Sequence, residues 1–277
     1  MFRPFFMALL FTVLCLPSHA QLGARAEVYK RSFFYVPAEN TFYCTSYFPS
    51  SDKAQCSDDQ SLGDSLLFYD VWGKAEDFGK LKVLANAYIS RSIPKVATEF
   101  EERIQASARA WFIDSFTVYG PPAGTNGTLE TAFLVTGSKF TNHLAGADGS
   151  LTAVNVDTGK FLGYEPIGAF GSSVTLSSSI VFGQPITVAY MLSTDLTLFN
   201  VANGGYDQQQ AFMDLSNTAT VTQFMVKDSS GKVVDAIVVA ASGSTYGGAL
   251  PVPEPPAVLL FAVGVAFRKL GIARRRI

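Results

Sequence analysis

Short alternating segments separated by turn residues run through most of this 277-residue chain. Clusters of Gly, Pro, Asn and Ser lie between many of them, and no sustained helical heptad or tandem repeat is present. This pattern predicts a mainly β protein built as an antiparallel β-sandwich or jelly roll. The predicted strands cover residues 81–89, 111–119, 131–137, 172–182, 186–192, 218–226 and 232–239.

Residues 97–114 fit two different periods. Apolar residues recur at helical spacing from Phe100 to Trp111, whereas residues 106–112 also alternate in the manner of a strand. Periodicity alone does not distinguish the two. Because the neighbouring segments are β-rich and the alternation continues beyond this stretch, we predict a long strand from about Arg103 onward.

Composition excludes several classes of protein. Hydrophobic residues make up 48% of the chain and charged residues only 16%, the reverse of the disorder signature. The sequence pI of about 5.7 argues against nucleic acid as a partner. The chain is long enough to form a large hydrophobic core.

The first twenty residues have the pattern of a secretory signal peptide. Arg3 precedes an apolar run over residues 5–16, and the small residues Ser18 and Ala20 flank His19. The apolar run is shorter than the about 20 residues that a membrane anchor needs. We therefore predict a signal-peptide helix over residues 1–20, with cleavage between Ala20 and Gln21. The Sec translocon and signal peptidase are its expected partners.

The other end of the chain has a stop-transfer pattern. An apolar stretch over residues 256–267 follows a proline-rich motif and precedes positive residues, which keep that end cytoplasmic. The motif consists of Val252, Pro253, Glu254 and Pro255, and the terminal positive cluster of Arg274, Arg275 and Arg276. We predict a short transmembrane helix between them.

This combination at the C-terminus resembles the tail of bacterial PEP-CTERM proteins. The resemblance implies that residues 251–277 form a sorting domain, that exosortase recognises Val252 to Pro255, and that the arginine cluster is the cytoplasmic stop. It also implies delivery to the cell surface or extracellular matrix of a biofilm-forming bacterium that makes exopolysaccharide. Arg268 and Lys269 interrupt the apolar stretch, so an ordinary membrane anchor is the alternative.

Parts of the middle of the chain are similar to the bodies of PEP-CTERM ectodomains. The similar stretches are residues 109–118, 182–186, 213–221 and 226–231. The resemblance covers this middle region loosely and does not extend to residues 21–90; between the two terminal signals we predict one β-rich ectodomain over residues 21–250. The same motifs are explained by turn chemistry, because Asp214, Ser216 and Asn217 favour turns and residues 228–231 fit a hairpin loop.

Cysteine and histidine content limits the chemistry of the mature chain. Cys44 and Cys56 remain after signal-peptide removal, and in an oxidising compartment they are predicted to form a disulfide. His143 is the single remaining histidine, too few for a zinc site built from His and Cys. We expect an ordinary surface role for it, because no nucleophile or orienting group is marked beside it.

Acidic residues suggest at most a structural calcium ion, and no other cofactor is predicted. The candidate ligands are Asp52, Asp58, Asp59 and Asp64 in and after the cysteine loop, or Asp148 and Asp157 in predicted turns. Glu99, Glu101 and Glu102 form a further acidic run that could bind a cation or sugar, although such runs are usually solvated faces.

Two functions from different classes follow from these residues. The first is an exported, non-catalytic surface or matrix protein that acts by adhesion, assembly or contact with exopolysaccharide. The alternative is a secreted carbohydrate-active enzyme, which needs two carboxyl groups about 5 to 10 Å apart in a cleft. Aromatic pairs at residues 42–43, 47–48 and 68–69 could stack on sugars or fill the core. No catalytic motif is present, so the first function is favoured.

Overall fold

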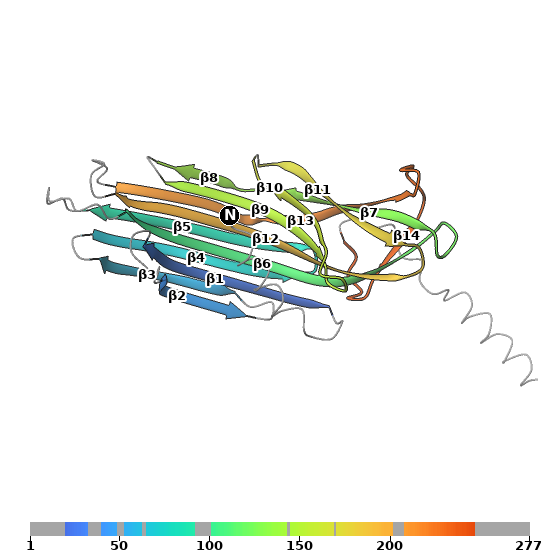
Figure 1. Cartoon of the computed structure of the whole chain (residues 1–277), viewed down its shortest axis with the longest axis horizontal. Helices are drawn as coiled ribbons and strands as arrows, with labels where there is room; N and C mark the ends of the chain where they lie inside the picture. The colour runs from blue at the N-terminus through green and yellow to red at the C-terminus, as the bar shows by residue number, and fades with distance from the viewer. Residues whose placement is uncertain are drawn as a thin grey trace, which may run out of the picture.

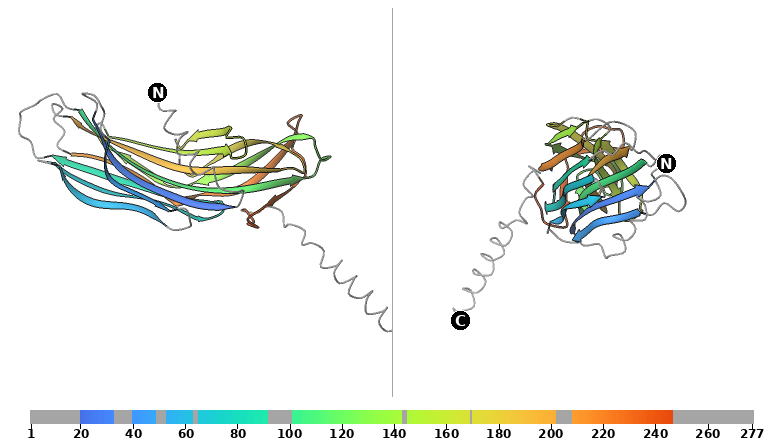
Figure 2. Two further views of the ribbon diagram at one scale, coloured as in Figure 1. Left: turned by 60° about the horizontal axis from the view of Figure 1, so that its bottom comes forward. Right: turned by 90° about the vertical axis from the view of Figure 1, so that its left-hand side faces the viewer.

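Two antiparallel β-sheets pack face to face in this protein (Figure 1). The computed structural model describes residues 20–32, 40–48, 53–62, 65–91, 101–142, 145–168, 170–201 and 208–246. These residues form fourteen strands and contain no helix. The predicted β-sandwich is thereby confirmed, and Figure 2 shows its two layers nearly end-on. No helix among the residues in these ranges is long and apolar enough to cross a membrane.

The first sheet is ordered β10-β9-β12-β6-β1-β2, and β14 also pairs with β6. Its strands are β1 (Gln21–Ser32), β2 (Asn40–Phe48), β6 (Glu101–Tyr119), β9 (Gly146–Asn155), β10 (Phe161–Pro166), β12 (Pro185–Val201) and β14 (Ile237–Ala240).

The second sheet is ordered β11-β7-β13-β5-β4-β3, and β8 also pairs with β13. Its strands are β3 (Ala54–Leu62), β4 (Ser65–Asp77), β5 (Lys80–Arg91), β7 (Asn126–Val135), β8 (Ser138–Thr141), β11 (Ser172–Val181) and β13 (Gln208–Asp228).

Eight of these strands form nested pairs. The β9–β10 hairpin is enclosed in the sequence by the pair β7–β11, then by β6–β12, then by β5–β13. Successive pairs alternate between the two sheets. The chain is therefore wound as one long folded hairpin, and β1 to β4 extend both sheets at the same side.

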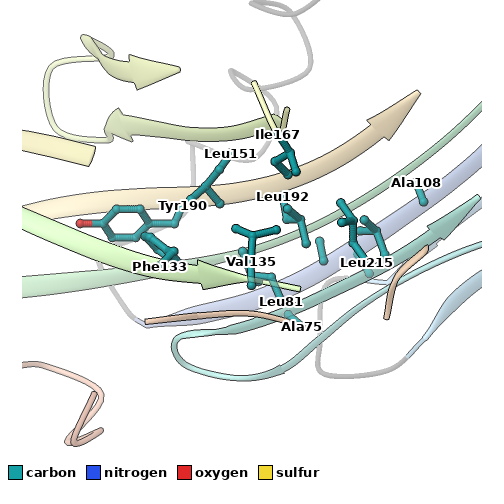
Figure 3. Packing of buried hydrophobic residues seen from close by; sticks show 14 of the residues in the cluster. Ala75, Leu81, Ala108, Phe133, Val135, Leu151, Ile167, Tyr190, Leu192 and Leu215 are labelled. Atoms are coloured by element: carbon teal, nitrogen blue, oxygen red, sulfur yellow. The ribbon is translucent and has the colours of Figure 1, made fainter. Parts of the chain in front are cut away.

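A continuous core fills the space between the sheets. Along β7 the burial pattern alternates, as expected for a strand with one face packed on a core. Figure 3 shows Tyr190 and Leu192 of the first sheet with Phe133 and Val135 of the second in this packed layer. The side chains named here are all fully buried.

One half of the core is lined by small residues. On β1 and β6, alanines occupy successive inward positions, and β4 presents Gly73 toward them. A Cβ placed at Gly73 would overlap the backbone carbonyl of Arg109, so the two sheets touch there backbone to backbone. The buried alanines of β1 and β6 are Ala24, Ala26, Ala106, Ala108 and Ala110.

The other half is filled by aromatic rings. Phe112 lies 5.1 Å from Tyr190 between ring centroids, and Phe133 lies 5.3 Å from Tyr190. Phe116 and Phe224 add an edge-on contact at 5.4 Å. Centroid separations of this size are the favourable range for aromatic pairs.

The strand predictions are confirmed for most segments, with longer strands than expected. The long strand predicted from Arg103 is β6, and the segments near 81–89 and 172–182 are β5 and β11. The segment 232–239 is confirmed only in its last part, because the strand there is Ile237–Ala240. Asp228 accepts hydrogen bonds from the backbone NH groups of Ser230 and Lys232, and this turn ends where the predicted segment begins.

Three predicted turns have different outcomes. Asp157 to Gly159 lies in the turn between β9 and β10, where Gly159 has a φ of 65°, as predicted. The expected turn at Asp148 is wrong, because this residue lies within β9 and pairs with Asp195 of β12. Asp214 likewise lies within β13, just before a shift in register between Leu215 and Ala219.

Candidate functional site

The outward face of the first sheet carries a second apolar cluster, separate from the core. Trp111, Ile113, Ala189 and Met191 belong to it, on neighbouring positions of β6 and β12. They alternate with the inward residues of these strands, so they lie on the face opposite the core.

An aromatic pair lies at one side of this cluster. The ring of Trp111 lies over Gly23 of β1, where an added Cβ would overlap the indole. Tyr47 of β2 stacks against the same indole, with ring centroids 5.8 Å apart and an interplanar angle of 25°. Trp111 is 9% exposed, whereas Tyr47 is 47% exposed. Trp111 therefore supports Tyr47, and Tyr47 presents ring surface to solvent.

Charged residues adjoin the aromatic pair on the same face. Arg25 pairs in register with Tyr47 on one side and with Arg109 on the other. Glu27 forms an ion pair with Arg25 and lies 4.0 Å from Nη1 of Arg109 through Oε2. The Arg109 Nη2 atom lies 3.9 Å from Oδ1 of Asp195 on β12. We call Tyr47, Trp111, Arg25, Glu27, Arg109 and Asp195 the outer-face site.

The charges of the outer-face site cancel, since two guanidinium groups face two carboxylates. The Nε atom of Arg25 is buried and has no hydrogen-bond partner among the described residues. The side chain of Asp195 is 48% exposed. The site therefore offers both donors and acceptors at its surface without a net charge.

A buried carboxylate lies on the opposite, core side of β6. Asp114 is fully buried and accepts hydrogen bonds from the backbone NH groups of Ser115 at 2.8 Å and Ser242 at 3.1 Å. The hydroxyls of Ser242 and Tyr246 also donate to it. Four donors satisfy the buried charge, as a carboxylate in a core requires. We call this arrangement the Asp114 anchor.

The Asp114 anchor fixes the last described segment of the chain to the core. The Tyr246 ring is buried and lies 5.3 Å from Phe224 and 5.6 Å from Phe116 between centroids. Burial and the neighbouring Asp114 carboxylate raise the pKa of the Tyr246 hydroxyl. The hydroxyl therefore stays protonated and remains a donor to Asp114.

The predicted cysteine pair lies at the edge strands β2 and β3. Cys56 is buried and disulfide-bonded, and its Sγ lies 3.5 Å from the carbonyl oxygen of Ala26. Cys44 belongs to β2 and pairs in register with Val28, but its side chain is outside the described set. The Cys44–Cys56 pairing therefore stays a prediction.

The acids predicted as calcium ligands lie apart where they are described. Asp58 is exposed on β3, and Asp148 is exposed on β9. Asp157 accepts a hydrogen bond from the Thr187 backbone NH at 2.9 Å. Within the described ranges, no group of three or more His, Cys, Asp or Glu side chains is placed to hold a metal.

Several predicted residues lie outside the described part of the chain. They are Asp52, Asp64, Glu99 and His143, the motif Val252 to Pro255, and the cluster Arg274 to Arg276. The side chains of Asp59, Glu101 and Glu102 are outside it as well. The predicted cleavage point is described on both sides, since Ala20 directly precedes the first residue of β1.

The outer-face charges and the Asp114 anchor were not predicted from the sequence. A signal for both was present in the alternation of residues 106–116. Asp114 occupies an inward position between Phe112 and Phe116, which marks a buried acid that needs partners. Arg109 and Trp111 occupy the opposite phase, which places them together on the outer face.

Comparison with known proteins gives no family. No family model and no curated protein matches the chain. A structure of the infectious bursal disease virus Gt strain matches at 10% identity, over 97% of this chain and 95% of that chain, with a TM-score of 0.16. A crystal structure of the infectious bursal disease virus VP2 subviral particle matches at 9% identity, over 96% and 94%, with a TM-score of 0.14. At these TM-scores the likeness supports no conclusion on fold or function.

Proposed function

We propose that this chain is an exported, non-catalytic surface or extracellular-matrix protein, and that exosortase recognises and processes its C-terminal tail. The combination of Val252 to Pro255, an apolar stretch and a terminal arginine cluster carries the proposal. The signal-peptide pattern before Gln21 supports export.

The first and last described residues of the sandwich are compatible with proteolytic cleavage at both ends of the chain. β1 begins at Gln21, which pairs with Ile113, so cleavage after Ala20 leaves the whole strand in the sheet. At the other end, the buried Tyr246 precedes Val252 by five intervening residues. The motif therefore begins within about 20 Å of the folded domain along an extended chain. A protease would cut beyond the core, not through it.

The outer-face carboxylates support a non-catalytic role. Glycoside hydrolysis requires one carboxylic acid to donate a proton to the leaving oxygen. Glu27 and Asp195 both lie beside Arg109, as charged partners of an arginine. Both acids are thus engaged by the same guanidinium group, an arrangement that suits binding better than proton transfer.

Two finer features of the fold belong to the same proposal. The nested strand pairs alternating between two sheets are the connectivity expected of a jelly roll, and we class the ectodomain so. A Cys44–Cys56 disulfide would join β2 and β3, the edge strands of the two sheets on one side. It would close that side of the sandwich by a covalent bond.

The mass of the released protein tests the sorting proposal in cells with and without exosortase. We expect a species that begins at Gln21 and ends near Pro255 only when the enzyme is present. Pro253→Ala with Pro255→Ala should retain the protein in the inner membrane, whereas Pro251→Ala with Pro256→Ala is the matched control outside the motif. An intact tail in both strains would make the C-terminus an ordinary membrane anchor.

A further inference from the structure

We propose that the outer-face site binds a neutral polysaccharide, with Tyr47 as the stacking platform and Arg25 and Asp195 as its hydrogen-bonding groups. Glu27 is buried and holds the two guanidinium groups in place. The inference rests on the proposed function, because it names the partner of a protein exported to a surface or matrix. The site itself is defined by side-chain geometry alone.

The platform consists of an exposed ring on a rigid support. Tyr47 is 47% exposed, and its ring is stacked on an indole that is itself held over the backbone of Gly23. An aromatic face fixed in this way loses little side-chain freedom on binding. The apolar face of a sugar ring is a suitable partner for it, because it presents flat CH surface that aromatic rings bury well.

Hydrogen-bonding groups begin directly beside the platform. Arg25 lies opposite Tyr47 on the neighbouring strand, where cross-strand Cβ atoms are about 5 Å apart. A sugar stacked on Tyr47 would therefore present its hydroxyls to Arg25, which the buried Glu27 holds in place. Arg25 supplies donors and the half-exposed Asp195 carboxylate supplies acceptors further along the polymer, and sugar hydroxyls need both.

The charge balance selects the class of polysaccharide. Arg25 and Arg109 are matched by Glu27 and Asp195, so the site has no excess positive charge to attract uronate or sulfate groups. An anionic polymer would meet the exposed Asp195 carboxylate and be repelled. A neutral polymer can bind without breaking any of the ion pairs of the site, and its hydroxyls can form hydrogen bonds with the same side chains. We therefore assign a neutral polysaccharide to this face.

Binding can be measured with the purified protein from Gln21 onward, without exosortase. The probes are cellohexaose, maltohexaose and mannohexaose as neutral oligosaccharides, and an oligogalacturonate as the anionic one. Trp111 reports binding through its fluorescence, because its ring contacts Tyr47. We expect saturable binding of at least one neutral probe and none of the oligogalacturonate. Failure here would leave the sorting result intact, and failure of sorting would leave binding intact.

Variants separate stacking from a purely structural role of the face. Tyr47→Ala should weaken binding by about tenfold, and Tyr47→Phe, which keeps the ring, should bind within about threefold of the parent. Asp195→Asn, at a half-exposed side chain, should weaken binding severalfold with an unchanged melting temperature. Tyr119→Ala is the matched control, because Tyr119 is 51% exposed and lies at the far end of β6.

Three results would overturn the proposal. The first is no binding of any neutral probe at millimolar concentration. The second is a preference for the oligogalacturonate over the neutral probes. The third is equal binding by the parent and Tyr47→Ala, since the aromatic pair would then only cover the outer face of the sheet.

Discussion

The two halves of the core are packed by opposite means. Beside β1 and β4, alanines and Gly73 allow the backbones of the two sheets to touch. Beside β7 and β12, aromatic rings such as Phe133 and Tyr190 hold the sheets apart and fill the space with side chains. The alanine-lined half is therefore destabilised by larger side chains, whereas the aromatic half is destabilised by smaller ones. Opposite substitutions should thus weaken the two halves of the same core.

The aromatic half should show the largest single effect. Phe133→Ala removes a fully buried ring that contacts Tyr190 and leaves a cavity, so we expect a loss of about 4 kcal/mol in the free energy of unfolding. Urea unfolding measures it. Leu134→Ala on the same strand is the control, because Leu134 is 39% exposed and should lose well under half as much. Equal losses would contradict a core on one face of β7.

The aromatic half should also make the protein sensitive to alkali. Burial raises the pKa of Tyr190 to about 12, and its hydroxyl shares a hydrogen bond of 2.7 Å with Thr131. A raised pKa means that the folded state keeps a proton that the unfolded state loses above about pH 10. The contribution of Tyr190 to the free energy of unfolding is therefore fully present below about pH 10. It is lost as the pH rises toward about 12, and the loss amounts to about 3 kcal/mol.

Unfolding midpoints between pH 8 and pH 12 check this prediction. Tyr190→Phe should make the alkaline part of the profile shallower than in the parent, because one titrating hydroxyl is gone while that of Tyr246 remains. Tyr119→Phe, at an exposed tyrosine, should leave the profile as it is. A profile as steep in Tyr190→Phe as in the parent would assign the whole alkaline loss to other groups, including Tyr246, whose pKa is also raised by burial.

The alanine-lined half should respond to a single added methyl group. Gly73→Ala places a Cβ against the carbonyl of Arg109, which belongs to the backbone and cannot turn away. We expect a loss of about 2 kcal/mol, typical of overpacking. Gly146→Ala is the matched control, because the nearest atom to its Cβ would be Thr197 Cβ at 3.8 Å. If both variants unfold at the same urea concentration, the sheets are not in backbone contact.

The strands of the sandwich could be predicted from the sequence to different extents. Alternation predicted the sandwich and the β6 strand, because each depends on a local period of two. It missed β1 to β4 as strands. For β3 the reason is composition, because Ser, Asp and Gln in residues 54–62 have low strand propensity and β3 is an edge strand. Strand propensity depends on whether a strand lies at an edge or in the centre of a sheet, so composition alone does not show such a segment.

The functional features are harder to predict, because they depend on strands that are far apart in sequence. The outer-face site joins Arg25, Arg109 and Asp195 from three strands, and only the register of β1, β6 and β12 brings them together. The Asp114 anchor spans 128 residues between Asp114 and Ser242. A single sequence shows an acid at an inward position, but not which donors will satisfy it.

The smallest expected effect concerns the Asp114 anchor. It lies in the aromatic half and holds the last described segment of the chain against β6. Ser242→Ala removes one hydroxyl donor to Asp114 and the acceptor of the Ser244 backbone NH, and it leaves the Ser242 backbone NH and Tyr246 in place. The cost should be about 1 kcal/mol, mainly from the lost bond to the buried carboxylate, because the Ser244 NH is only half-buried and can bond to water instead. Because the bond ties only residues 241–246 to β6, this loss should appear as local opening more than as global unfolding.

Limited proteolysis resolves local from global opening. Cleavage after the buried Tyr246 requires the segment to leave the core, so chymotrypsin should cut Ser242→Ala about fivefold faster there than the parent. Ser244→Ala is the control, because Ser244 lies in the same segment and donates only its backbone NH, to the Ser242 hydroxyl. Equal cutting of Ser242→Ala and the parent would mean that the aromatic rings around Tyr246 hold the segment without the carboxylate. The packing of the aromatic half would then secure the end of the domain by itself.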